Sequence, residues 1–172
     1  GITKSFPGVV ALKNVDIKVN SGEVHCIVGE NGAGKSTLVK VLTGLYRADE
    51  GSLVVEGEDE VDLHSKHHGH EQEIVAYVPQ ELDLFVNLTV AENMFIPFTR
   101  AKDSSFFFRK KHWERRAEEL IRRLKMNVRP NDLVRNIPVS DQQLLQVARA
   151  LASENARVII LDEPTTSLTA GE

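Results

Sequence analysis

The stretch Gly29-Glu30-Asn31-Gly32-Ala33-Gly34-Lys35-Ser36-Thr37 decides the fold of this chain. It fits the pattern G-x-x-x-x-G-K-S/T, in which a glycine-rich turn leads into a helix and holds the phosphates of a nucleotide. Glycines let several backbone N–H groups converge on one point, and the start of the following helix adds positive potential there. Lys35 adds a mobile cation, and the Ser36 hydroxyl is a suitable ligand for Mg²⁺. The stretch therefore predicts a phosphate-binding loop, the alternative being a glycine-rich turn before an ordinary helix.

The residues on either side of this loop favour the first interpretation. Residues 23–28 are apolar and rich in β-branched side chains, which predicts a short buried strand. Cys26 lies inside this segment, so we expect the single cysteine of the chain to pack in the core. After the loop, a run at helical spacing stops at Gly44, as a helix C-terminus does. The apolar members of that run are Leu38, Val39, Val41 and Leu42.

A second motif follows about 120 residues downstream, because residues 157–164 read as an apolar strand ending in two acids. Burial of a strand on both sheet faces explains why its apolar residues do not alternate with polar ones. The segment resembles a Walker B motif. Asp162 would then hold Mg²⁺, and Glu163 would orient or deprotonate the attacking water. The alternative is a core strand followed by two acids in a turn. In that case both this segment and the glycine-rich loop would match nucleotide-binding motifs by chance.

Composition limits the class of protein further. The chain has 172 residues, a net charge of −4 and a pI of about 5.9, which gives no support for a nucleic-acid partner. One cysteine excludes an internal disulfide. No apolar run approaches the ~20 residues that span a bilayer. The chain starts at Gly1 and stops just past the second motif, so we expect it to be a fragment of a longer polypeptide.

With these motifs in place, the chain resembles the ATPase domain of ATP-binding cassette (ABC) proteins. Within that superfamily it is most similar to the N-terminal cassette of bacterial monosaccharide importers of the ribose, galactose and xylose group. The resemblance runs almost end to end and rests on residues 2–12, 28–38, 79–82, 88–93, 142–151 and 162–169.

This resemblance implies an α/β fold with a P-loop NTPase core, an N-terminal antiparallel β layer and an inserted α-helical subdomain. Residues 1–172 would form a single ABC ATPase domain, truncated at its C-terminus. Residues 1–89 and 153–172 would make the nucleotide-binding core, and residues 90–152 the helical subdomain. The sequence supports helix in that insert, because an apolar stripe recurs at helical spacing. Its members are Trp113, Ala117, Leu120, Ile121 and Leu124.

The resemblance also implies roles for single residues. Phe6 matches the aromatic that stacks on adenine, although a surface or core Phe beside a turn is the alternative. Gln80 matches a glutamine that reaches Mg²⁺ and the attacking water. The implied catalytic residues are Glu163, Lys35 and Gln80. The implied ATP contacts are Phe6, Gly29, Glu30, Asn31, Gly32, Ala33, Gly34, Lys35, Ser36, Thr37, Gln80 and Asp162. The implied Mg²⁺ ligands are Ser36, Gln80 and Asp162.

One motif departs from the family pattern. The signature Leu-Ser-x-Gly-x-Gln aligns with residues 137–142, where Pro138 replaces the serine and Ser140 replaces the glycine. A local interpretation makes Ser140 the N-cap of a helix, with Gln143 completing a capping box. A functional interpretation makes this a weakened signature donated to a partner cassette, so that the two ATP sites of the pair are unequal. The two interpretations are compatible.

The resemblance implies that the intact protein binds MgATP and hydrolyses it in a pair with a second cassette, in the same chain or a homodimer. Closure and reopening of the pair would drive sugar uptake through transmembrane permease subunits at the cytoplasmic face of the membrane. A periplasmic or extracellular sugar-binding protein would take part indirectly, and no nucleic acid would. One alternative is a regulatory cassette that hydrolyses weakly, and another is a soluble ABC protein acting on ribosomes or DNA. The switch histidine is expected beyond Glu172, so we expect negligible ATPase activity from the isolated chain.

A cluster of four histidines within residues 64–70 leaves one further possibility open. Histidines this close in sequence could bind a metal ion. Their spacing does not have the form of a zinc site, and no cysteine accompanies them. A solvated loop is the alternative interpretation.

Overall fold

The computed structural model describes residues 1–55, 63, 74–96 and 106–162, with the backbone alone for residues 106–109. The chain divides into two compact units, Gly1–Val75 and Ala76–Glu172. Within the described ranges, no helix is both long enough and apolar enough to cross a membrane.

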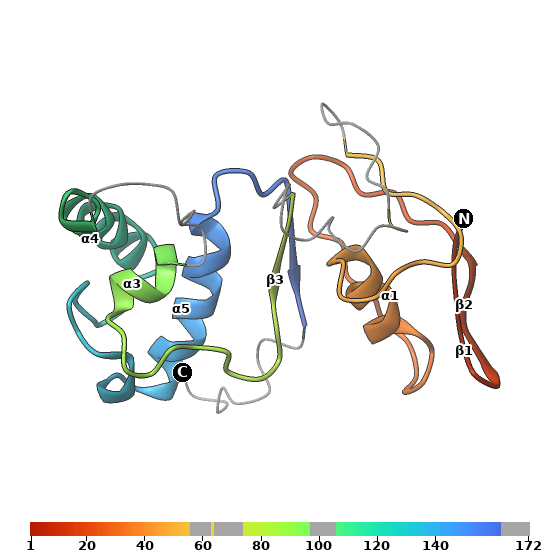
Figure 1. Cartoon of the computed structure of the whole chain (residues 1–172), viewed down its shortest axis with the longest axis horizontal. Coiled ribbons are helices and arrows are strands. Elements are labelled where there is room, and N and C mark those ends of the chain that lie inside the picture. Colours follow the sequence, from red (N-terminus) through yellow and green to blue (C-terminus); the bar gives the residue numbers. More distant parts are fainter. Residues whose placement is uncertain (56–62, 64–73, 97–105, 163–172) are drawn as a thin grey trace. The chain divides into compact units, whose positions relative to one another are not determined.

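The described residues of the first unit form an antiparallel hairpin and one α-helix (Figure 1). Strand β1 (Ile2–Phe6) pairs with β2 (Val9–Val15), and the two-residue turn between them ends at Gly8, whose φ is 81°. Helix α1 (Lys35–Leu42) packs against β2. The predicted N-terminal antiparallel β layer is therefore confirmed. Its core consists of Ile2, Leu12, Leu38, Val41, Ala48, Leu63 and Ile74.

Helix α1 ends where the sequence predicts. Its last residue is Leu42, and Thr43 is the C-cap. Gly44 follows with a φ of 75°, and its N–H donates to the Val41 carbonyl at 3.1 Å. A residue without Cβ adopts this left-handed conformation at little cost, and the bond satisfies a carbonyl that the helix leaves open.

The predicted strand over residues 23–28 is wrong in this structure. The segment carries no strand, and Val24 and Val28 are 97% and 87% exposed. Cys26 is exposed as well, which corrects its expected place in the core. In the described residues, the segment's main-chain bonding is a turn from the Glu23 N–H to the Asn20 carbonyl at 3.1 Å. β-Branched residues favour extended backbone. A segment becomes a β-strand only if a neighbouring strand accepts its backbone hydrogen bonds, and composition does not supply that neighbour.

Among its described residues, the second unit contains a strand pair and three α-helices. Strand β3 (Val75–Val78), which starts at the boundary of the units, pairs with β4 (Val158–Leu161). The Asp162 N–H donates to the Val78 carbonyl at 3.0 Å, so the carboxyl ends of both strands lie together and the pair is parallel. The helices are α3 (Val90–Phe95), α4 (Phe106–Arg123) and α5 (Val139–Ala152), with a 3₁₀ turn, η2 (Val134–Asn136), before the last.

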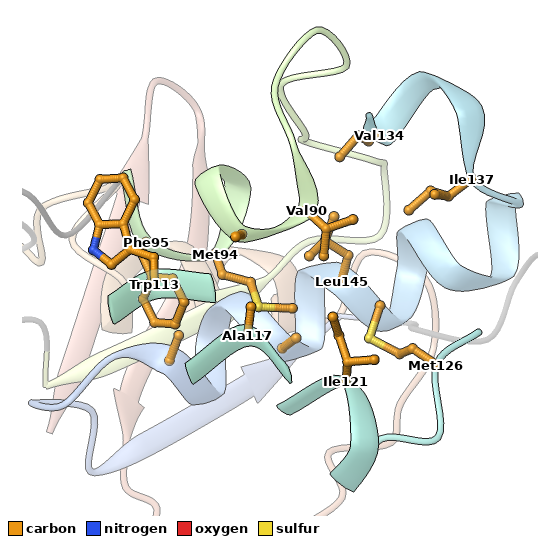
Figure 2. Close-up of a cluster of buried hydrophobic side chains, with 13 residues drawn as sticks. Val90, Met94, Phe95, Trp113, Ala117, Ile121, Met126, Val134, Ile137 and Leu145 are labelled. Carbon is orange, nitrogen blue, oxygen red and sulfur yellow. The ribbon is translucent and has the colours of Figure 1, made fainter. Parts of the chain in front are cut away.

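The three helices enclose one apolar core (Figure 2). Met94 and Leu145 are fully buried in it, and the rings of Phe95 and Trp113 stack with centroids 6.3 Å apart. The apolar stripe predicted on α4 is confirmed, because it supplies the buried side chains of Trp113, Ala117 and Ile121, while Leu120 and Leu124 pack at the edge.

Polar side chains hold the start of α3 in place. Thr89 and Glu92 form a capping box, in which each side chain accepts from the other residue's backbone N–H. The fully buried Asn93 amide accepts from the Phe85 N–H at 2.8 Å and donates to the carbonyls of Phe85 and Thr89, each at 3.0 Å. This stretch, which contributed to the family resemblance, therefore builds local structure.

A core substitution tests the packing of the helices. We expect Leu145→Ala to lower the free energy of unfolding by about 2–5 kcal/mol, because it removes a fully buried side chain and leaves a cavity. Denaturant unfolding measures this change. The control on the same helix is Val139→Ala, which removes a 54% exposed side chain and should change stability by less than about 0.5 kcal/mol. Equal losses from the two variants would contradict the described core.

Candidate functional site

The glycine-rich loop meets α1 through a close backbone contact. Gly32 and Gly34 have φ of 83° and 92°, in the left-handed region that favours glycine. A Cβ on Gly34 would lie 2.5 Å from the Ala11 carbonyl oxygen and 3.0 Å from a methyl of Leu12. Only glycine fits this position, because any side chain would collide with the backbone of β2. The hairpin thereby determines where the loop turns into the helix.

Lys35 is the first residue of α1, and its side chain folds back over the loop. Its Nζ donates to the Gly29 carbonyl at 2.6 Å and to the Glu30 carbonyl at 2.8 Å. The first turn of α1 contains no acidic residue, and the Ser36 side chain beside Lys35 is exposed. The Lys35 ammonium and the open N–H groups at the helix start attract anions, and the exposed Ser36 hydroxyl is a group that can bind a cation.

Phe6 lies at the other end of α1 from this loop. Its ring makes an edge-to-face contact with Tyr46, with centroids 5.4 Å apart, and Lys4 Nζ lies 5.6 Å from its centroid. Tyr46 follows the C-terminal end of α1, whereas Lys35 begins the helix. The Phe6 ring is 37% exposed. An aromatic face is therefore available in this unit, next to a second aromatic that sequence reasoning did not single out.

Asp162 stands at the carboxyl end of β4, as the second motif predicts for an Mg²⁺ ligand. Its Oδ2 accepts a hydrogen bond of 3.0 Å from the Tyr77 hydroxyl on β3. Burial, and then the neighbouring Asp162 carboxylate, raise the pKa of Tyr77 to about 12. The phenol is therefore a neutral hydrogen-bond donor throughout the physiological range. Tyr77 is a residue that sequence reasoning missed, because nothing in its own neighbourhood marks it.

Gln80 is an exposed residue just beyond the end of β3, and α5 holds the segment that follows it. The nearly buried Gln146 side chain donates through Nε2 to the Glu81 carbonyl at 3.0 Å. Arg149 donates to the Asp83 carbonyl at 2.7 Å. These two bonds connect α5 directly to the chain after Gln80. Both contacts reach backbone carbonyls, and Arg149 also lies 3.4 Å from the Asp83 carboxylate, in a segment far from α5 in sequence.

The altered signature at residues 137–142 leads into α5, but the predicted cap is wrong. The N-cap is Pro138, which has a φ of −57° and a ψ of 154° and whose carbonyl accepts the Gln142 N–H at 3.0 Å. Ser140 lies in the first turn of the helix and makes no cap bond. The Gln143 Oε1 is buried without a hydrogen-bond partner among the described atoms, so no capping box forms. Proline suits a helix start because it needs no N–H partner there and its φ is already helical.

The structure places the predicted site residues in both units. The glycine-rich loop and Phe6 belong to the first unit, and Gln80, Asp162 and the signature segment belong to the second. Glu163 and the histidine cluster at residues 64–70 lie outside the described residues. Over the described ranges, no three His, Cys, Asp or Glu side chains gather where they could hold a metal ion. The Ser36 hydroxyl and the Asp162 carboxylate each offer the oxygen type that Mg²⁺ takes as a ligand.

These features are those of an α/β protein with a P-loop NTPase fold. The ABC transporter family profile matches residues 12–166. The chain therefore belongs to the ABC transporter family.

Curated relatives in this family are named as sugar importers. The ribose import ATP-binding protein RbsA of Clostridium perfringens (strain SM101 / Type A) is 42% identical over 169 residues, which are 98% of this chain and 33% of that protein. Ribose import ATP-binding protein RbsA 1 of Streptomyces avermitilis is 46% identical over 172 residues, which are 100% of this chain and 32% of that protein. The chain thus spans about a third of the length of the curated relatives it matches.

Solved structures support the same fold. A dimeric bacterial ABC transporter cassette matches with a TM-score of 0.76 and 26% identity, over 98% of this chain and 74% of that one. A dimeric ATP-binding cassette in a post-hydrolysis state, bound to ADP and Pi, matches with a TM-score of 0.74 and 25% identity, over 98% of this chain and 73% of that one. The predicted α/β P-loop fold is confirmed by these neighbours.

The close approach at Gly34 can be tested directly. We expect Gly34→Ala to lower the free energy of unfolding by about 1–3 kcal/mol, because its methyl group meets the Ala11 carbonyl at a left-handed backbone position. Denaturant unfolding measures the loss. Gly29→Ala is the matched control within the same loop, since its Cβ would meet Ala33 Cβ at an ordinary 3.6 Å. A Gly34→Ala protein as stable as the Gly29→Ala protein would refute this contact.

Proposed function

We propose that this chain is the ATP-binding part of a protein that hydrolyses ATP to drive import of a monosaccharide of the ribose class. The observation that carries the proposal is the glycine-rich loop, with Lys35 folded over it at the start of α1. The 42% and 46% identities to ribose import ATP-binding proteins, over nearly the whole chain, support the sugar class.

The proposed mechanism assigns each residue a separate part in phosphoryl transfer. Loop N–H groups and Lys35 bind the phosphates and stabilise the charge that develops on the transferred group. Ser36 and Asp162 would hold Mg²⁺, which would neutralise part of the phosphate charge when bound. Gln80 contributes to the Mg²⁺ ligands and positions the attacking water, and Glu163 accepts its proton.

The remaining ATP contacts in the proposal surround these groups. Glu30, Asn31, Gly32, Ala33 and Thr37 line the loop with Gly29 and Gly34. Phe6 would stack on adenine, which requires that the face of its exposed ring receive the base.

The proposed domain division assigns residues 1–89 and 153–172 to the nucleotide-binding core and 90–152 to the helical subdomain. The contacts of α5 support a working connection between these parts. Gln146 and Arg149 lie on α5, and the backbone that they bind follows Gln80. A movement of the helical subdomain would therefore shift the segment that carries the γ-phosphate sensor.

The proposed partners are a second cassette and transmembrane permease subunits, with a sugar-binding protein acting indirectly. The cassettes solved as dimers support the first partner. Three exposed apolar side chains in the segment after Gln80 support the second, because such a surface suits a protein interface. They are Leu82, Phe85 and Val86, which are 42%, 53% and 49% exposed. The proposed location is the cytoplasmic face of the membrane.

The activity is tested on the full-length protein, reconstituted with its permease in lipid vesicles. We expect ATP hydrolysis that rises when ribose and its binding protein are present. Glu163→Gln should lower turnover about 100-fold or more while ATP still binds, because it removes the proton acceptor. Lys35→Met should weaken ATP binding about 10- to 100-fold, because it removes a charge-assisted bond to phosphate.

Two results would contradict the proposal. One is full turnover by the Glu163→Gln protein, which would remove that residue from catalysis. The other is ATP hydrolysis that no pentose or hexose changes, which would remove the transport coupling.

The altered signature favours a second candidate, a cassette pair in which one site hydrolyses poorly. Restoring the family pattern with Pro138→Ser and Ser140→Gly together should then raise ATP turnover of the full-length protein. The physical reason is that a serine hydroxyl and a close glycine backbone would again face the partner's nucleotide. Steady-state phosphate release measures the effect. Ser140→Ala alone is the control, since it keeps a side chain at the position, and an unchanged rate in the double variant would reject the idea.

A further inference from the structure

The Tyr77 hydroxyl makes the one side-chain bond to Asp162 in the described part of the chain. The bond runs from the phenol oxygen to Asp162 Oδ2 and measures 3.0 Å. The two residues are 85 positions apart in sequence and meet because β3 and β4 are neighbours. Both side chains are partly buried, so the contact is shielded from competing water.

The backbone of Asp162 is held as well as its side chain. Its N–H donates to the Val78 carbonyl at 3.0 Å, at the residue next to Tyr77. Strand β3 thus holds Asp162 at two points. Val78 bonds its main-chain N–H, and Tyr77 bonds its Oδ2. These two bonds restrict the side-chain torsions that would be free in an isolated aspartate.

We propose that Tyr77 is a positioning residue, which orients the Asp162 carboxylate for Mg²⁺ bound with the nucleotide. The inference rests on the proposed function, because it concerns the same nucleotide site. A metal-ligating carboxylate is usually hydrogen-bonded by an outer partner, and removing such a partner costs metal affinity. Tyr77 has the chemistry for this role, since a phenol can donate without adding a charge.

A tyrosine suits the position next to Asp162 because its hydroxyl is an uncharged hydrogen-bond donor. A lysine or arginine bonded to Asp162 would compensate its negative charge and weaken its attraction for a cation. A phenol leaves the charge on the carboxylate and fixes only its direction. The same strand leads through Pro79 to Gln80, so β3 supports two of the proposed Mg²⁺ ligands at once.

The test measures magnesium affinity, not activity alone. Isothermal titration gives the ATP dissociation constant of the full-length protein in EDTA and over a series of Mg²⁺ concentrations. Tyr77→Phe should raise the Mg²⁺ concentration needed for half of the metal-dependent gain in ATP affinity by about tenfold, within the range seen when outer partners are removed. ATP affinity in EDTA should stay unchanged, because the phenol is not expected to touch the nucleotide.

Tyr46→Phe is the matched control. It removes the hydroxyl of the only other tyrosine and keeps the ring that packs against Phe6. This variant should leave the Mg²⁺ dependence at the wild-type value. Tyr77→Met is a second variant that lacks the donor, for use if the Tyr77→Phe protein unfolds. Thermal melting checks the fold of each variant.

A double-mutant cycle shows whether Tyr77 acts through Asp162. In an Asp162→Asn background, Tyr77→Phe should produce no further change in Mg²⁺ affinity. A wild-type Mg²⁺ dependence in both Tyr77 variants would overturn the inference, as would an equal loss of ATP affinity with and without Mg²⁺. If instead the wild-type protein showed no Mg²⁺-dependent ATP binding, the proposed function itself would fail.

Discussion

The first unit depends on the close approach of Gly34 to the backbone of β2. Because no Cβ fits between Gly34 and the Ala11 carbonyl, the loop must turn into α1 at this point. That turn sets the orientation of α1, which then buries Leu38 and Val41 in the core beside the hairpin. It also places Lys35 at the first helical position, from which its ammonium reaches the loop carbonyls. Packing of the first unit and the proposed phosphate binding therefore depend on the same backbone contact.

In the second unit, helix α5 contributes both to the apolar core and to the proposed site. Its apolar face supplies Leu145 and Ala148 to the helical core, while Gln146 and Arg149 bond the segment beyond β3. The same helix starts at the altered signature. Helix α5 thus connects the surface proposed to face a partner cassette with the segment proposed to sense the γ-phosphate. Such an arrangement would let the state of one ATP site influence the other through helix movement.

The altered signature has a structural explanation that does not conflict with a functional one. Pro138 caps α5 without a side-chain bond, so the helix needs neither the serine nor the glycine of the family pattern to begin. Stability therefore places little constraint on these two positions. If the partner site requires a hydroxyl and a close backbone, the changes at Pro138 and Ser140 would weaken that site while leaving the fold of this one intact.

The local chemistry of neighbouring residues is enough to predict the glycine-rich turn into α1, the end of α1 at Gly44 and the buried stripe of α4. The predicted strand at residues 23–28 and the predicted burial of Cys26 are wrong, because pairing and burial depend on neighbouring segments that composition does not specify. The N-cap of α5 was placed two residues late, because a serine pattern was preferred to a proline. Only the tertiary structure decided that Tyr77 meets Asp162 and that α5 binds the chain after Gln80, because these bonds join residues far apart in sequence, in two cases through backbone carbonyls.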